Sequence, residues 1–166
     1  RLGIPATIFV PRVASPATFA TAASMSFGIA TFTPEIIFER LFSSVAFDTT
    51  SRGTNLHLVE WVEDFLRPLG AELVRVPNAD GDKANLWARF GPDRPGGIVL
   101  SGHTDVVPID GQPWSTDPWD LIERGGKWFA RGTTDMKGFI ALALAYAETI
   151  SKIDLKAPVH FAFSYD

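Results

Sequence analysis

The chain has 166 residues, of which 46% are hydrophobic and 20% are charged, proportions that are ordinary for one globular domain. The net charge is −4 and no run of Lys or Arg stands out, so nothing indicates a nucleic-acid or membrane partner. There is no cysteine, which excludes disulfides and thiolate metal ligands. A metal site in this chain would therefore use carboxylates and the three histidines, His57, His103 and His160.

The first 33 residues differ in composition from the rest. Every acidic residue lies at Glu35 or later, and residues 1–33 are rich in Ala, Ser, Thr and Pro. Such a stretch can be a transit or secretory segment, but its prolines break helices and it holds no long apolar run. We therefore expect residues 1–33 to be a disordered or non-native leader, with residues 1–24 a mis-started extension, and we place the protein in the cytoplasm.

Two helices and two strands are expected next. Residues 34–46 have a proline at the first helical position and apolar side chains at helical spacing, which predicts a helix. Residues 55–66 repeat the helical spacing and are followed by a proline and a glycine that end a second helix. The hydrophobic period then changes, and residues 71–76 and 85–90 are predicted to be strands separated by a polar turn.

The alternation continues to the end of the chain. Residues 97–101 are predicted to be a strand, and its apolar run Ile98-Val99-Leu100 is typical of a strand buried on both faces. A short strand at 127–130, an apolar helix at 136–151 and a final strand at 159–165 follow. Because helices and strands alternate, the fold class is α/β with a largely central sheet.

A histidine and an aspartate follow the strand at 97–101. Active-site groups of open α/β sheets collect at such carboxyl ends of strands, which is where His103 and Asp105 are expected. A neutral imidazole is a good zinc ligand, and a carboxylate two residues away can orient its ring. Alone the pair is a weak signal, since a His-x-Asp pair arises easily by chance and a histidine there can simply cap a turn.

A second candidate lies at the start of the apolar helix. The loop Arg131–Gly138 contains a glycine and delivers Asp135 to that helix. An aspartate there can be the helix N-cap and need no other role. A carboxylate at the same place can also bridge two cations about 3.5–4 Å apart, as in two-metal hydrolases. The local sequence leaves these two roles evenly balanced.

Together the two segments resemble the M20 metallopeptidase family. The similarity covers residues 34–166, and its details are most similar to the acetylornithine deacetylase branch. The matching motifs are Phe47-Asp48-Thr49, Lys83-Ala84-Asn85-Leu86, Gly102-His103-Thr104-Asp105-Val106-Val107-Pro108, Gly111-Gln112-Pro113-Trp114, Asp117-Pro118, and Arg131 to Phe139.

The resemblance implies a zinc-exopeptidase-like, three-layer domain with a central mixed sheet. It implies that residues 34–166 are the truncated front part of the catalytic domain, without the lid or dimerisation domain. It implies that His103 binds one Zn²⁺, that Asp135 bridges two Zn²⁺ ions, with Co²⁺ a possible replacement, and that Asp105 acts in catalysis by positioning His103. It also implies a cis peptide bond between Asp135 and Met136.

The implied activity is hydrolysis of the amide of an N-acyl amino acid, with N-acetylornithine in arginine biosynthesis as first candidate. The metals activate a water, and a glutamate carries the proton to the leaving amine. In the family that glutamate follows the position of Asp166, so we expect residues 1–166 alone to be inactive and their last strand to expose an edge. The complete protein is a candidate homodimer. The alternatives are a desuccinylase or carboxypeptidase of the same family, and a non-catalytic binding module.

Four other charged or titratable residues have less specific patterns. His160 lies in a strand pattern and is expected to be a hydrogen-bonded core histidine, and His57 is expected on the surface. Arg131 and Lys137 flank Asp135, where they either balance its charge or have an ordinary solvated role.

Overall fold

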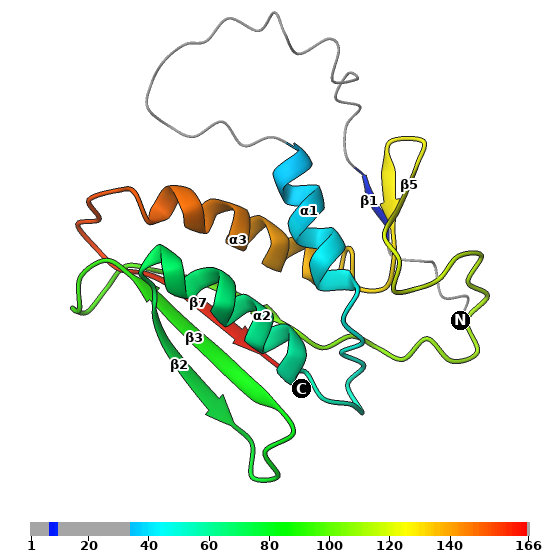
Figure 1. Cartoon of the computed structure of the whole chain (residues 1–166), viewed down its shortest axis with the longest axis horizontal. Coiled ribbons are helices and arrows are strands. Elements are labelled where there is room, and N and C mark those ends of the chain that lie inside the picture. The colour runs from blue at the N-terminus through cyan, green and yellow to red at the C-terminus, as the bar shows by residue number, and fades with distance from the viewer. Residues whose placement is uncertain (1–6, 10–33, 166) are drawn as a thin grey trace, which may run out of the picture.

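The structure is a computed structural model that describes residues 7–9 and 34–165 (Figure 1). Most of the leader expected at 1–33 lies outside the described residues. Within it, Thr7–Phe9 is described as strand β1. The expectation of a disordered or non-native leader stays a prediction.

The predicted helices and strands are present, with boundaries shifted by one or two residues. The helices are α1 (Pro34–Val45), α2 (Leu56–Leu66), the 3₁₀ helix η2 (Arg67–Leu69) and α3 (Lys137–Ile150). The strands after β1 are β2 (Glu72–Pro77), β3 (Ala84–Phe90), β4 (Ile98–His103), β5 (Ile122–Arg124), β6 (Lys127–Phe129) and β7 (Val159–Ser164). Only β5 among the strands after residue 33 was not predicted, because three residues are too few to establish a period.

Four strands form the main sheet, in the order β2-β3-β7-β4. The pairs β2–β3 and β3–β7 are antiparallel, whereas β4 and β7 are parallel. The predicted α/β fold with a mixed sheet is therefore confirmed. The expectation that the final strand exposes an edge is wrong, because β7 lies between β3 and β4, and the edges of this sheet are β2 and β4.

The main core lies between this sheet and the helices α2 and α3 (Figure 1). In β3 and β7 buried side chains alternate with more exposed ones, which is the period of a sheet covered on one face. The inward side chains of these strands meet the buried stripes of the two helices. Fully buried members of this core are Leu58, Leu66, Ala88, Ile140, Leu144, Ala147 and Phe161. Each large one contributes roughly 1.5–3 kcal/mol of hydrophobic stabilisation.

The outer face of the sheet carries apolar side chains that the described residues do not cover. Val99 lies on this face and is 52% exposed, whereas Ile98 lies on the opposite face, in register with Val159 at the start of the strand, and is 58% exposed. The prediction that their strand is buried on both faces is therefore wrong. The cause is the arrangement of layers: within residues 7–9 and 34–165, helices pack against one face of the sheet, and β4 is an edge strand. Two of the three layers implied by the resemblance are thus described.

A second, smaller sheet of order β1-β6-β5 packs near α1. Trp128 of β6 is buried against Phe38 of α1, with ring centroids 5.3 Å apart. Leu41 and Val45 of α1 join the same cluster. This cluster anchors the chain immediately before the loop that carries Asp135. No helix in the described part of the chain is long and apolar enough to cross a membrane.

Two adjacent glycines give a test of the β4–β7 pairing. Gly97 and Gly96 both have a positive φ, of 91° and 99°. A Cβ on Gly97 would lie 2.0 Å from the carbonyl oxygen of Pro158, whereas a Cβ on Gly96 would meet nothing within 4 Å. We predict that Gly96→Ala costs about 1–3 kcal/mol from backbone strain and that Gly97→Ala costs clearly more, since β4 must move away from β7. Chemical denaturation of the two variants measures the difference, and equal losses would contradict the described register.

Candidate metal site

The two predicted metal ligands lie face to face. His103 is the last residue of β4, and Asp135 lies in the loop between β6 and α3. The Nε2 atom of His103 is 2.9 Å from Oδ1 of Asp135, although the residues are 32 positions apart. The fold thus brings together the imidazole and the carboxylate that the sequence singled out.

The other ring nitrogen of His103 is held by its own strand end. Nδ1 lies 2.9 Å from the backbone carbonyl oxygen of Asp105 and 3.5 Å from Oδ1 of the Asp105 side chain. A carbonyl oxygen only accepts hydrogen bonds, so this contact assigns the proton to Nδ1. The lone pair of Nε2 then faces Asp135. The backbone carbonyl of Asp105 thus accepts the hydrogen bond from Nδ1, whereas the expected role of the Asp105 carboxylate in positioning the ring stays a prediction.

Electrostatics favour a positive charge at this point. Burial lowers the pKa of His103, but the hydrogen bonds to Asp135 and to the Asp105 carbonyl, with the charges of both carboxylates, outweigh it. The pKa of His103 is therefore raised above its ordinary value. A neutral imidazole has one N–H, whereas two acceptors face this ring. Either a second proton or a cation has to satisfy the side toward Asp135, and the groups present suit a zinc ion there.

The alternative role of Asp135, as a helix cap, is excluded by the geometry of α3. The N-cap residue is Met136, and no side chain caps this helix end. The Asp135 side chain is 78% exposed and directed at His103. The peptide bond Asp135–Met136 is cis, as the family resemblance implied.

The described residues do not by themselves complete a metal site. In residues 7–9 and 34–165, no group of three or more His, Asp or Glu side chains is placed to hold one ion. His103 and Asp135 offer a nitrogen and an oxygen of the kinds that zinc binds, whereas a zinc site normally has at least three protein ligands. A metal held by these two residues would therefore need further ligands.

The two cationic neighbours of Asp135 are not solvated. Arg131 is buried and donates a hydrogen bond from Nη2 to Oε1 of Gln112. Its guanidinium carbon also lies 5.1 Å from the ring centre of Trp114, and burial lowers its pKa. Lys137 is 0% exposed. Sequence analysis missed both roles, because spacing along the chain does not tell toward which side a long side chain turns.

Lys137 is the more unusual of the two. Its Nζ donates a 2.6 Å hydrogen bond to the backbone carbonyl oxygen of Phe47. Burial lowers the pKa of Lys137 to about 7, and the charge of Asp48 partly opposes that effect. Of the two alternatives for Lys137, the solvated role is therefore wrong, because its side chain is buried in the protein.

The remaining histidines lie apart from the site. His57 is exposed on α2, as expected. His160 points to the outer face of the sheet, where its ring lies tilted against Trp87 with ring centres 4.8 Å apart, and its Nδ1 has no hydrogen-bond partner among the described residues. The prediction of a hydrogen-bonded core histidine is wrong, since the register of β7 turns Phe161 rather than His160 inward.

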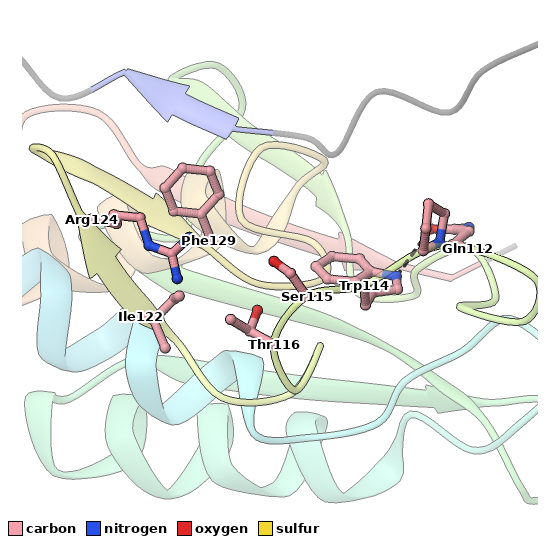
Figure 2. A pocket seen from close by; sticks show the side chains of 8 residues that line it. Gln112, Trp114, Ser115, Thr116, Ile122, Arg124 and Phe129 are labelled. Carbon is pink, nitrogen blue, oxygen red and sulfur yellow. Dashed lines mark hydrogen bonds between the residues drawn. The ribbon is translucent and has the colours of Figure 1, made fainter.

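A pocket of about 140 Å³ lies beside the site loop but does not contain His103 or Asp135. Figure 2 shows Ser115 and Thr116 facing Arg124 of β5 across the opening, with Phe129 of β6 nearby. Its lining also includes Trp114, which packs against Arg131. The pocket is thus separate from His103 and Asp135, and it adjoins the Asp135 loop through the contact of Trp114 with Arg131.

Similarity to known proteins supports the same class of protein. Residues 99–166 match the model of peptidase family M20/M25/M40, and this segment contains His103, Asp105 and Asp135. The structure is also similar to part of human carnosine dipeptidase 1, with a TM-score of 0.68 and 27% identity over 78% of this chain and 31% of that one. The M20 resemblance and the fold class inferred from the sequence are confirmed.

Two curated relatives carry one name. The chain is 40% identical over 103 residues to acetylornithine deacetylase of Pasteurella multocida, covering 61% of this chain and 26% of that protein. It is 36% identical over 115 residues to acetylornithine deacetylase of Shigella sonnei, covering 68% and 30%. The chain therefore spans only 26–30% of the length of these relatives.

His103 gives the first test of the metal site. In the full-length protein, we predict that His103→Ala lowers zinc affinity by more than the roughly 10–100-fold typical of losing a group behind a ligand. Asp105→Ala should cost less, because the backbone carbonyl that holds Nδ1 remains. His57→Ala, an exposed control, should change nothing. Chelator competition measures the affinities, and wild-type zinc affinity in His103→Ala would remove His103 from the site.

Proposed function

We propose that the full-length protein is a metal-dependent hydrolase that cleaves the amide of an N-acyl amino acid, with N-acetylornithine as the first substrate candidate. The single observation that carries the proposal is the 2.9 Å contact between His103 and Asp135 inside the segment that matches the M20 model. The 40% identity to an acetylornithine deacetylase supports the choice of substrate and a place in arginine biosynthesis. Zn²⁺ is the proposed cofactor, two per complete site, and Co²⁺ can replace it.

Each residue of the site has a definable task in this proposal. His103 would hold a metal through Nε2, because the Asp105 carbonyl accepts a hydrogen bond from Nδ1 and so leaves Nε2 directed at Asp135. Asp135 would contribute a largely exposed carboxylate as a metal ligand. The Asp105 carboxylate adds negative charge near Nδ1 and thereby raises the basicity of the ring. When bound, the zinc ions supply Lewis acidity, which lowers the pKa of a water and polarises the acyl carbonyl.

A peptidase that acts on short peptides is the second candidate. It is supported by the similarity to human carnosine dipeptidase 1, at 27% identity. Both reactions hydrolyse an amide and use the same metal-holding residues. The deacetylase, the peptidase and a desuccinylase differ from one another in the acyl group of the amide that they cleave. A non-catalytic module would bind a ligand without hydrolysing it. The proposal also includes a cytoplasmic location and a homodimer, which cell fractionation and sedimentation test.

A substrate panel tests the function directly. We predict that the zinc-loaded full-length protein hydrolyses N-acetylornithine faster than N-succinyl-diaminopimelate or a dipeptide, measured as released amine. A chelator should abolish the rate, and added Zn²⁺ or Co²⁺ should restore it. Asp135→Ala, purified in the same way, should be inactive and so exclude a contaminating host enzyme. Zinc binding without hydrolysis of any substrate would favour the binding module.

The isolated 166 residues give a further test. We predict that they bind zinc weakly and do not hydrolyse these amides, since the described part contributes only His103 and Asp135 as candidate ligands. A positioned proton carrier typically adds about 10²–10⁴-fold to the rate, and none is assigned among the described residues. The uncovered sheet face should also promote association. Calorimetry and light scattering measure these properties, and robust hydrolysis absent from an Asp135→Ala control would contradict the prediction.

A further inference from the structure

A fully buried lysine lies two residues after Asp135. Lys137 is 0% exposed, its Nζ donates to the Phe47 carbonyl oxygen at 2.6 Å, and it lies 5.5 Å from the ring centre of Trp119. Burying a charged amine costs several kcal/mol unless hydrogen bonds and charges compensate. An apolar side chain of similar length would fill this space without that cost but would leave the Phe47 carbonyl without this donor. The lysine is therefore there for what its ammonium group contacts.

The segment that Lys137 contacts is bound at its other end to the chain after His103. We call residues 47–51 the strap. The Thr49 hydroxyl donates to the carbonyl oxygen of Thr104 at 2.7 Å. The backbone N–H of Val106 donates to the Thr49 carbonyl oxygen at 3.0 Å, and the N–H of Ser51 donates to the Val106 carbonyl oxygen at 3.0 Å. The strap is thus paired, like a short strand, with the residues that immediately follow the predicted ligand.

The loop that carries Asp135 packs against both Val106 and Lys137. Gly132 has a φ of 80°, and a Cβ there would lie 2.8 Å from a methyl carbon of Val106 and 3.3 Å from the side chain of Lys137. The backbone N–H of Lys137 also donates to the Gly132 carbonyl oxygen at 2.8 Å. The loop is therefore closed on itself by Lys137 and has no free space on the side of Val106. Movement of the strap would be passed to the loop through these contacts.

We propose that Lys137 is a positioning residue for the metal site: its ammonium group ties the strap to the start of α3 and so holds Asp135 opposite His103. Lys137 touches neither ligand through Nζ and acts through the Phe47 carbonyl. The inference rests on the proposed function in treating His103 and Asp135 as metal ligands. Its structural part, that Lys137 holds the strap in place, stands on the contacts alone.

Lys137→Met is the informative variant, because Met fills the buried volume and cannot donate a hydrogen bond. Lys156→Met is the matched control, since Lys156 is exposed and pairs only with the neighbouring Asp154 among described groups. In the full-length protein we expect Lys137→Met to keep a melting temperature close to wild type and to lose roughly 10–100-fold in zinc affinity. The value of kcat should fall with little change in KM. The control should match wild type in all of these.

A second measurement does not depend on metal or activity. Hydrogen exchange at the amides of Ser51 and Val106, which join the strap to the chain after β4, should be faster in Lys137→Met than in wild type. If Lys137→Met does not fold, Thr49→Val, which removes the bond to Thr104, should show the same faster exchange and weaker zinc binding. Wild-type exchange and wild-type zinc affinity in the folded variant would overturn the proposal, as would a lower melting temperature as the only effect.

The two proposals fail in different ways. A wild-type protein that binds zinc and hydrolyses none of the amides sinks the proposed function, while the exchange rates and zinc affinities of Lys137→Met still decide the role of Lys137. Conversely, an active wild type with an unaffected Lys137→Met variant removes only the positioning role.

Discussion

The imidazole of His103 lies between two hydrogen-bond acceptors, the backbone carbonyl of Asp105 at Nδ1 and the carboxylate of Asp135 at Nε2, each at 2.9 Å. A neutral ring can satisfy one of them. Since the carbonyl cannot donate, the one N–H of a neutral ring lies at Nδ1, and Nε2 has no proton to donate to Asp135. A positive charge is therefore favoured between Nε2 and the carboxylate. This constraint links the site to its chemistry, because a cation at Nε2 satisfies the carboxylate and the ring together.

The fold produces this arrangement from the end of a strand, β4, and the start of a helix, α3. β4 ends at His103 beside its parallel neighbour β7, and the carboxyl end of a parallel strand is where α/β folds gather their functional groups. The helix α3 begins next to that end, so the loop before it brings Asp135 to the same point. The strap then joins the two, since it pairs with Val106 on one side and accepts a hydrogen bond from Lys137 on the other.

Much of this could be predicted from local sequence. The helical spacing at 34–46 and 55–66 and the His-x-Asp pattern at the end of a strand were sufficient to place the elements and His103. The exposure of Val99 could not be predicted, because burial depends on which layers cover the sheet and not on the strand itself. The central position of β7 was equally inaccessible, since sequence order does not fix strand order. The sequence predicts that Lys137 lies near Asp135, but the direction of its side chain depends on tertiary packing and could not be predicted.

The directions of the Arg131 and Lys137 side chains leave the carboxylate oxygens of Asp135 free of an ion pair with either residue. Had Arg131 or Lys137 paired with this carboxylate, the ion pair would compete with any metal for the same oxygens. Instead Arg131 is directed to Gln112, and Lys137 to the Phe47 carbonyl. Among the described residues, His103 is the only ion-pair partner of Asp135. Two buried basic side chains thus stabilise the surroundings of the loop through neutral oxygens, and the carboxylate of Asp135 is left to face His103.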